Sequence, residues 1–335
     1  MIRSTGETWI RVEDASAVGA ARRVAETLAA SLGFGVHECG RVALAVSEAA
    51  SNLVKHAVEG RILIRPHARP APEAPAVVEV IAVDKGPGMP DFARALRDGY
   101  STAGTLGVGL GGIARMASKH EVYTLPGRGT VIAMWFTSGT PPAFQMSGLT
   151  RPIGEEIVCG DAFACVDGPG TAVAMLCDGL GHGELAAQAS RQAVRTFQEH
   201  ADLPPAALVE RIHRALSGTR GGAVAVARLD RDSGMIRYAG LGNVAGWIVR
   251  ADGRQGMISV PGIAGHQIRT LRDYEYAAPP HSMIIMHSDG LTDRWNIATF
   301  PGLTAHSPAV VAATLLRDAG TRRDDASIVT MKVTP

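Results

Sequence analysis

Cysteines and aromatic residues are scarce in this chain, its net charge is small, and long apolar runs are missing. The 335 residues include 4 cysteines and 5% aromatic residues, and the formal net charge is +1. A charge so close to neutral provides no overall field for nucleic acid or anionic lipid, so we expect neither as a partner. No stretch reaches the ~18 apolar residues that cross a bilayer, and the first residues have no apolar core of signal-peptide length. These absences predict a cytoplasmic protein without a membrane segment.

The few cysteines follow no metal-binding pattern. Cys39, Cys159, Cys165 and Cys177 lack the paired spacing of a zinc site, so we expect reduced thiols, most of them in the core. Glycine is plentiful at 39 residues, and 46% of the chain is hydrophobic, which is a globular composition. A length of 335 residues exceeds what one hydrophobic core usually serves, so two domains are expected.

The beginning of the chain has the pattern of helices followed by strands. Apolar residues recur at helical spacing between Asp14, which suits an N-cap, and Gly33, which suits a helix end. A second helix with one apolar face is expected over 37–57. Segments rich in Val and Ile then predict strands at 61–65, 77–83 and 130–136. This order predicts an α+β domain with helices on one mixed sheet.

Regular periodicity lapses between 138 and 149, where small, polar and Pro residues gather as they do in linkers. We therefore expect one domain at 1–137 and another at 150–335. The second domain combines expected strands at 172–177, 222–229, 235–240, 283–288 and 327–333 with expected helices at 184–199, 205–217 and 308–318. Because strands and helices do not alternate strictly, this order favours two sheets flanked by helices.

Two polar clusters in the first domain indicate a nucleotide pocket. Glu48 and Asn52 are four residues apart on the second helix, so they project from one flank. Asp84 follows an apolar strand, and a carboxylate there can accept a hydrogen bond from an exocyclic amine such as that of adenine. Gly86 and Gly88 would let the backbone approach a flat ligand closely. Taken singly, a solvated helix flank and a DKGPG turn would explain these residues equally well.

A glycine-rich run, STAGTLGVGLGG at 101–112, precedes the helical pattern IARMASKH. Glycines that lead into a helix N-terminus present backbone N–H groups and a positive dipole end to phosphates. The spacing of the last glycines matches GxGxxG, but the residues before them do not form a convincing strand, which argues against a dinucleotide-binding turn. The candidate phosphate-binding residues in this run are Gly104, Gly107, Gly109 and Gly111.

The ordered trio of ExxxN on a helix, DxGxG after a strand and a glycine-rich segment before a helix resembles the Bergerat-type (GHKL) ATPase fold. The resemblance covers about residues 10–136 and is greatest to the anti-sigma and stressosome serine kinases. It implies an α/β sandwich that binds ATP with Mg²⁺. By this resemblance Asn52 would bind Mg²⁺, Asp84 would bind adenine and the glycines would hold the phosphates. Glu48 would be the base that orients a substrate serine.

Acidic residues in the second domain share one context, the edge of a strand beside a small residue. They are Asp161, Asp178, Asp289, and Asp324 or Asp325. An apolar strand that ends in Asp places a carboxylate at the rim of a sheet, and converging rims create a dense negative site. Divalent cations neutralise such a site, and oxygen-only ligands favour Mg²⁺ or Mn²⁺ over Zn²⁺. A simple Asp-Gly turn is the alternative explanation for any single one of these residues.

The chemistry of phosphate esters also favours metals. Hydrolysis of a phosphate monoester requires up to ~10²¹-fold acceleration, whereas one general acid or base supplies about 10²- to 10⁴-fold. Two adjacent cations can generate hydroxide at neutral pH, orient the phosphate and stabilise the leaving oxygen together. A phosphatase built on these carboxylates would therefore need two ions.

The motifs GD, DGLGHG, SDGLTD and DDAS occur in the order found in PP2C-type phosphatases. Over about residues 150–333 the second domain resembles their sporulation and stress-response branch. The resemblance implies an α-β-β-α sandwich, two Mn²⁺ or Mg²⁺ ions, and a catalytic Asp178 that bridges them. The ligand set that it implies is Asp161, Asp178, the carbonyl of Gly179, Asp289 and Asp324.

Three neighbours of these motifs have less definite roles. Asp325 is expected to support the metal ligands and not to bind the ions. His182, in DGLGHG, is either a loop residue near the metals or a general acid. Arg151 lies in a region where the eukaryotic branch carries a phosphate-binding arginine, but the spacing does not assign it that role.

The two resemblances together imply a bifunctional partner-switch regulator. The first domain would phosphorylate Ser or Thr on a small STAS-domain antagonist, and the second would remove the phosphate. Two alternatives stay open on the sequence alone: a phosphatase regulated by a non-catalytic ATP-binding module, and a switch whose first domain binds an anti-sigma or sigma factor. A homodimer is also left open.

Overall fold

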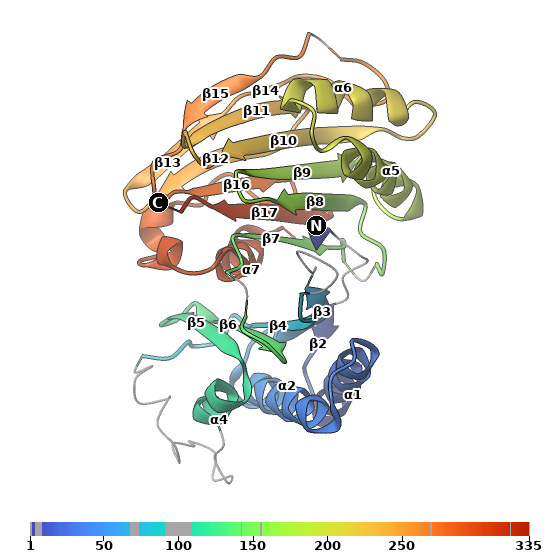
Figure 1. The fold of residues 1–335 in the computed structure, drawn as a ribbon. Coiled ribbons are helices and arrows are strands. Elements are labelled where there is room, and N and C mark those ends of the chain that lie inside the picture. The colour runs from blue at the N-terminus through green and yellow to red at the C-terminus, as the bar shows by residue number, and fades with distance from the viewer. Residues whose placement is uncertain are drawn as a thin grey trace. The chain divides into compact units, whose positions relative to one another are not determined.

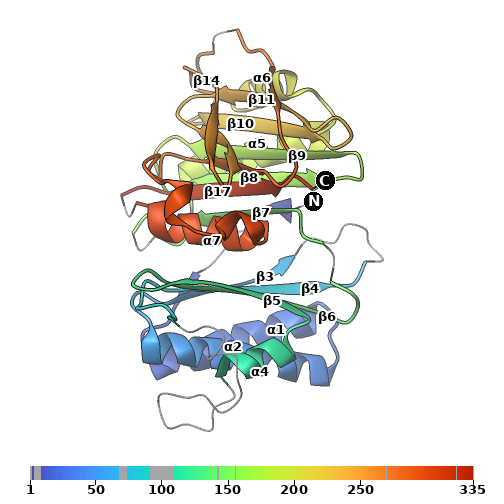
Figure 2. The same ribbon diagram turned by 90° about the vertical axis from the view of Figure 1, so that its left-hand side faces the viewer.

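The computed structural model describes residues 2–3, 9–67, 74–90, 109–141, 143–154, 156–268, 270–321 and 323–334. The chain divides into two compact units. We refer to Thr8–Ala143 as the N-terminal unit, and to Phe144–Pro335 together with Met1–Glu7 as the C-terminal unit. Figures 1 and 2 show the elements of each unit. Among the described residues, no helix is both long enough and apolar enough to cross a membrane.

The helices of the N-terminal unit begin and end where the sequence signals predict. Helix α1 spans Ala15–Ser31, and Oδ1 of its N-cap Asp14 accepts hydrogen bonds from the backbone N–H of Ser16 (2.8 Å) and Ala17 (3.1 Å). Helix α2 spans Val36–His56, and helix α4 spans Gly109–Met116. The first two match the expected helices to within one or two residues, whereas α4 ends before the expected IARMASKH pattern does.

The strands of this unit are β2 (Trp9–Arg11), β3 (Arg61–His67), β4 (Val77–Val83), β5 (Lys119–Leu125) and β6 (Gly129–Thr137). They form one sheet in the order β2-β3-β4-β6-β5. Every described pair in this sheet is antiparallel, so the expected mixed sheet is antiparallel over these residues. The helices lie on one face of the sheet (Figure 2), where alternate strand residues such as Val78, Val80 and Met134 join the helix side chains in one core.

The other face of β4 carries a buried ionic network. Glu79 is fully buried; its Oε2 accepts a hydrogen bond from Arg65 Nε (2.6 Å), and its Oε1 accepts one from Trp135 Nε1 (2.8 Å). The positive charge of Arg65 and the His67 contact hold the pKa of Glu79 well below its usual range, despite the opposing effect of burial. This carboxylate is therefore ionised inside the fold and depends on its partners.

The C-terminal unit is a sandwich of two sheets. One sheet has the order β1-β8-β9-β10-β11-β14, with β15 paired to β11, and the other has the order β13-β12-β16-β17-β7. The first contains β1 (Ile2–Arg3), β8 (Asp161–Asp167), β9 (Thr171–Gly179), β10 (Gly222–Asp230), β11 (Met235–Leu241), β14 (Ser259–Val260) and β15 (Tyr274–Ala277). The second contains β7 (Met146–Arg151), β12 (Ala245–Arg250), β13 (Gly253–Met257), β16 (Met283–His287) and β17 (Ala326–Lys332).

Helices cover the outer faces of the sandwich. Helices α5 (Glu184–His200) and α6 (Pro205–Ala215) pack on the first sheet through a core that includes Phe197, Leu208 and Val224. Helix α7 (Pro308–Ala319) packs against β7 and β17 of the second sheet. Between the sheets, side chains such as Phe163 and Met286 form a separate core. These layers are the expected α-β-β-α arrangement, and the α+β class is confirmed (Figure 1).

Several elements were not expected from the sequence. Strand β7 occupies part of the segment 138–149 that has the composition of a linker, and β1 joins the C-terminal unit by pairing with β8. Strands β2, β5 and β12–β15 were not expected either, and β8 was expected only through the placement of Asp161 at a strand edge. All cysteines are free thiols, and Cys39, Cys165 and Cys177 are buried, as the sequence indicates.

Candidate functional site

Two carboxylates of the first sheet face each other at one end of the sandwich. Strand β8 begins at Asp161 and β9 ends with Asp178 and Gly179, and these strands pair so that Asp161 lies directly opposite Asp178. Alternation along the strands puts both side chains on the face of Phe163 and Leu176, which lies between the two sheets. Because β9 is apolar and buried, Asp178 near its end lies at the inner edge of the sandwich.

The second sheet supplies two more carboxylates at the ends of paired strands. Asp289 follows the end of β16, Asp324 precedes the start of β17, and β16 and β17 pair antiparallel with His287 opposite Ile328. Gly290 brings the two segments together, because a side chain there would lie 1.9 Å from the carbonyl oxygen of Asp325. The glycine of the Asp-Gly pair at 289–290 thus allows two strand ends to lie close together, so the pair does more than form a turn.

Burial and mutual repulsion dominate the electrostatics of this edge. Burial, together with the charges of Asp161, Asp289 and Asp324, raises the pKa of Asp178 to about 9. Burial also raises the pKa of Asp161 to about 7, while the nearby Ser288 and Ser327 hydroxyls oppose the shift. The pKa of Asp289 is raised by burial and by the charge of Asp324. The four carboxylates from two sheets therefore act on one another as a single acidic cluster.

The donor set of this acidic cluster suits hard divalent cations. Asp161 is 4% exposed, and its Oδ2 has no hydrogen-bond partner although it is buried. A buried carboxylate oxygen without a donor is strongly disfavoured unless a cation or proton satisfies it. Over the described part of the chain, no three His, Cys, Asp or Glu side chains already stand in the arrangement of a metal site. The oxygen donors of the acidic cluster thus fit Mg²⁺ or Mn²⁺ by their chemistry.

Asp325 supports the acidic cluster through the backbone. Its Oδ1 accepts a hydrogen bond from Ile153 N (2.8 Å) and its Oδ2 accepts one from Gly160 N (2.7 Å). The same residue donates its own N–H to Asp324 Oδ1 at 2.9 Å. Both oxygens of Asp325 are therefore engaged in holding the segment that leads into Asp161.

Asn243 belongs to the acidic cluster and was missed in the sequence. Its Nδ2 donates a hydrogen bond to Asp289 Oδ2, and this bond lowers the pKa of Asp289 against the effect of burial. The signal that could have found it is its position just after strand β11, at the same kind of strand end that carries the aspartates.

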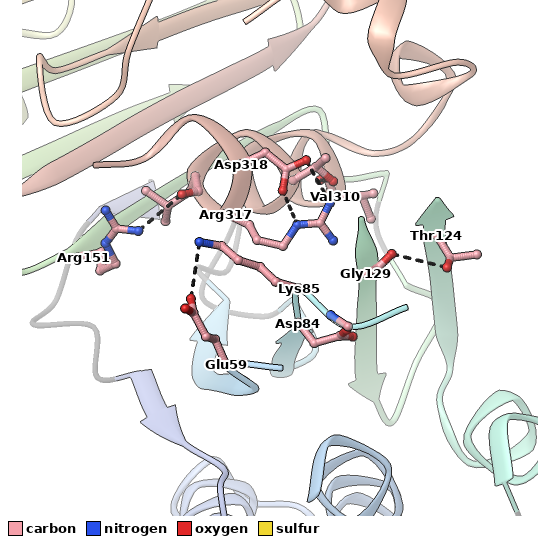
Figure 3. A network of polar contacts seen from close by, with 12 residues as sticks. Glu59, Asp84, Lys85, Thr124, Gly129, Arg151, Val310, Arg317 and Asp318 are labelled. Carbon is pink, nitrogen blue, oxygen red and sulfur yellow. Dashed lines mark hydrogen bonds and ion pairs between the residues drawn. The ribbon is translucent and has the colours of Figure 1, made fainter. Parts of the chain in front are cut away.

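His182 and Arg151 occupy definite but different places. His182 is exposed, and its Nδ1 lies 2.6 Å from Glu156 Oε1. The guanidinium of Arg151 donates to the carbonyls of Leu316 (3.4 Å) and Thr321, so it caps the C-terminal end of α7 (Figure 3). The structure thus gives Arg151 a role in holding the end of α7.

In the N-terminal unit, α2 and the end of β4 carry the expected nucleotide residues. Glu48 and Asn52 lie one turn apart on α2, and both are partly exposed. Asp84 directly follows β4; its Oδ1 accepts a hydrogen bond from Gly86 N (2.6 Å), and its N–H donates to Thr130 O (3.0 Å). The carboxylate thus closes a tight turn and remains partly exposed at the strand end.

The turn after Asp84 is fixed by backbone contacts. Gly88 has a φ of 67°, which favours glycine, and Lys85 forms an ion pair with Glu59 at 3.3 Å (Figure 3). On the neighbouring strand, the Thr124 hydroxyl donates to the carbonyl of Gly129 at 3.3 Å. The backbone around Gly88 therefore lies against the end of β5, and the predicted approach of a ligand to this turn stays a prediction.

The glycine-rich run is described only in its last part. Gly104 and Gly107 lie outside the described residues. Gly109 and Gly111 lie in the first turn of α4, so the run does not simply precede the helix but enters it. Arg41 of α2 donates two hydrogen bonds to Met116 O (2.7 and 3.2 Å), which fixes the far end of α4 against α2. The N-terminus of α4 is thereby held in the same unit as Glu48 and Asn52.

Comparison with known proteins assigns each unit to a group. The family model of the histidine kinase-like ATPase domain matches residues 12–136, and that of stage II sporulation protein E matches residues 168–334. The serine/threonine-protein kinase RsbT of Bacillus subtilis is 34% identical over 126 residues, which cover 38% of this chain and 92% of RsbT. The phosphoserine phosphatase RsbX of the same organism is 24% identical over 137 residues, which cover 40% of this chain and 68% of RsbX.

A solved structure is also similar. The structure described as "The bacterial stressosome: a modular system that has been adapted to control secondary messenger signaling" aligns with a TM-score of 0.51 and 28% identity, covering 57% of this chain and 100% of that one. The relatives and family models agree with the two α+β units. The chain therefore belongs to the histidine kinase-like ATPase family through its RsbT-homologous N-terminal unit, which is fused to a SpoIIE-type PP2C phosphatase domain.

Proposed function

We propose that this chain is a bifunctional partner-switch regulator that removes phosphate from Ser or Thr of a STAS-domain protein and can also phosphorylate it. The observation that carries the phosphatase half is the pairing of Asp161 and Asp178 in register, with the buried Oδ2 of Asp161 lacking a donor. Relatives named as a serine kinase and a phosphoserine phosphatase match different parts of the chain, which supports opposed activities.

In the phosphatase domain, we propose that Asp178 and the carbonyl of Gly179 would hold two Mn²⁺ or Mg²⁺ ions. The remaining proposed ligands are Asp161, Asp289 and Asp324. When bound, the two ions supply hydroxide at neutral pH and neutralise the charge of the phosphate. The chain's own contribution is to hold the carboxylates from two sheets at one edge, with Asn243 orienting Asp289 through its amide.

In the ATPase unit, Asn52 is proposed to bind the Mg²⁺ of ATP and Asp84 to accept a hydrogen bond from the adenine amine. Gly86, Gly88 and the glycines of 101–112 would border the nucleotide. Glu48 is proposed to take the proton of the substrate hydroxyl as its oxygen bonds to the γ-phosphorus and the bond to ADP breaks. ATP supplies the phosphoryl group, and the helix N-terminus of α4 suits its negative charge.

Two opposed activities in one chain would consume ATP without net effect unless something selects between them. We therefore propose that binding of the STAS partner or of a further regulator decides which site acts. The stressosome structure similar to this chain supports an assembly of this general kind.

The test uses the full chain with ATP, Mn²⁺ and purified STAS-domain proteins, and follows phosphate on the partner by intact mass. We expect Glu48→Gln to abolish phosphate gain and to leave dephosphorylation intact. Asp178→Asn should abolish dephosphorylation and hydrolysis of p-nitrophenyl phosphate, as should EDTA. Phosphate gain that survives Glu48→Gln would disprove the assigned base, and hydrolysis that persists in EDTA would disprove the metal-dependent phosphatase.

A further inference from the structure

Arg220 lies at the end of the loop that joins α6 to β10, beside the acidic cluster. Strand β10 begins at Gly222, which pairs with Gly179, and the next residue pairs with Asp178. The loop therefore ends within two residues of the strand position opposite the proposed bridging aspartate. This proximity follows from the register of β9 and β10.

The backbone around Arg220 is held from several sides. Its carbonyl accepts a hydrogen bond from His266 Nε2 (3.0 Å), and the following N–H of Gly221 donates to Thr219 Oγ1 (3.0 Å). The carbonyl of Gly221 in turn accepts from Leu180 N at 3.0 Å, which ties the loop to the DGLGHG segment. The base of the Arg220 side chain is thus fixed relative to the end of β9.

The guanidinium of Arg220 reaches over the backbone that follows Asp178. Its Nη1 lies 3.0 Å from the place that a β-carbon would take on Gly181, three residues after Asp178. Arg220 is exposed, and in the described part of the chain its guanidinium forms no hydrogen bond or ion pair. The acidic residues and backbone nearby leave its donors available to a ligand.

A phosphoserine that enters this site must approach several buried carboxylates while carrying about two negative charges. A guanidinium offers parallel N–H donors that match two phosphate oxygens, and it keeps its charge at any physiological pH. Arg151 cannot serve in this way, because it caps α7.

We propose that Arg220 binds the phosphate group of the substrate and sets its affinity, an inference that rests on the phosphatase function proposed above. Because the interaction is made with the phosphate already in the bound substrate, its loss should raise KM more than it lowers kcat. Arg220 also binds inorganic phosphate, the product, through the same donors. The substrate class is a phosphate monoester dianion.

The test compares full-length wild type, Arg220→Gln and Arg220→Lys with p-nitrophenyl phosphate at saturating Mn²⁺. We expect Arg220→Gln to raise KM about tenfold, with kcat changed by less than about threefold, and to raise the inhibition constant of inorganic phosphate by a similar factor. Arg220→Lys should recover part of both effects, since it restores the charge without the fork of donors. The matched control is Arg195→Ala, which should behave as wild type. Arg195 is an exposed residue of α5 whose guanidinium, among the described residues, bonds to Gln192 alone.

The outcomes separate this inference from the function on which it depends. A wild-type chain that does not hydrolyse the substrate with Mn²⁺ would refute the phosphatase proposal and the role of Arg220 with it. An active wild type together with an Arg220→Gln variant of unchanged KM and unchanged phosphate inhibition would overturn the Arg220 assignment alone. A fall in kcat with both constants unchanged would overturn it too. Unaltered melting temperature and Mn²⁺ affinity in Arg220→Gln would exclude a folding defect as the cause of a raised KM.

Discussion

Replacing Asp178 with Asn should stabilise the metal-free phosphatase domain while destroying its activity. Burial and three neighbouring carboxylates raise the pKa of Asp178 to about 9, against an ordinary value of 3.8. At neutral pH the folded domain must therefore either keep a proton on this carboxylate or bury an extra negative charge. The unfolded chain has no such constraint, so the carboxylate opposes folding whenever the pH exceeds its ordinary pKa.

The size of this effect follows from the pKa. At pH 7 the carboxylate is about three pH units above its ordinary pKa, and each unit is worth about 1.36 kcal/mol, which sets an upper limit of about 4 kcal/mol. An Asn side chain also loses hydration when buried, so we expect a gain of about 2 kcal/mol. Since the folded state binds more protons than the unfolded state between pH 4 and about 9, the stability contribution of Asp178 falls as the pH rises, and the advantage of Asn grows.

The assay is calorimetry of the full chain in EDTA, with the phosphatase transition identified as the one that Mn²⁺ shifts in wild type. For a domain of this size, about 2 kcal/mol corresponds to a rise in Tm of roughly 4–8 °C. Asp252→Asn, whose carboxylate is exposed and paired with Arg250, is the control and should change Tm little. Added Mn²⁺ should stabilise wild type more than Asp178→Asn. An Asp178→Asn variant that melts at or below the wild-type temperature in EDTA at every pH would refute the reasoning.

Three further predictions concern residues outside the proposed ligands. Arg65→Met should destabilise the ATPase unit by about 3–5 kcal/mol in urea unfolding, because the buried Glu79 loses its arginine partner. Adding Glu79→Leu should recover most of the loss, and no recovery would argue against the ion pair as the cause. The pKa of Glu79 is held below its usual 4.5, so its stabilising contribution is present above that pH and is lost as the pH falls. Glu79→Gln should therefore weaken the loss of unfolding free energy at acid pH. An unchanged dependence of the unfolding free energy on acid pH would contradict this. Asp325→Ala frees the N–H groups of Ile153 and Gly160, so the hydrogen exchange of these amides should accelerate. The affinity for Mn²⁺ should fall about tenfold, because the segment that leads into Asp161 is no longer held. Unchanged exchange would show that Asp325 does not hold this segment.

Much of the fold could be predicted from local signals. Asp14 caps α1 as its position before an apolar period predicts, and the apolar runs became buried strands such as β9 and β16. Several of the missed strands are short or lie at sheet edges, such as β2, β5 and β13. Strand β5, KHEVYTL, is only partly buried, and its first residues continue the helical pattern of IARMASKH. Local periodicity could not reveal that pairing with β6 wins over a longer α4.

Long-range pairing was equally hidden. The two residues of β1 carry no strand signal of their own, yet they pair with Cys165 and Ala164 of β8, which are far away in the sequence. Strand β7 begins inside a segment whose Ser, Gly and Pro content predicts a linker, because Met146 and Leu149 are buried by β17 and the sandwich core. Composition averaged over a dozen residues conceals such a change.

The convergence of the aspartates could be predicted from the sequence, whereas the roles of these residues stay predictions. Aspartates that end apolar strands were expected to converge, and the register of β8 and β9 and the mutual effects on pKa bring Asp161, Asp178, Asp289 and Asp324 together. Asn243 was missed because an asparagine after a strand has no motif that sets it apart from a turn residue. Arg220 has no sequence signal either, since its position depends on how β10 aligns with β9.

The most direct test of whether the acidic cluster binds two cations is to count the Mn²⁺ ions on the full chain without nucleotide. Calorimetric titration together with electron paramagnetic resonance gives this number. Our account predicts two ions per wild-type chain, close enough to be magnetically coupled, and loss of the coupled signal in Asp178→Asn. Saturable binding that is the same in wild type and Asp178→Asn, or no binding at all, would contradict it.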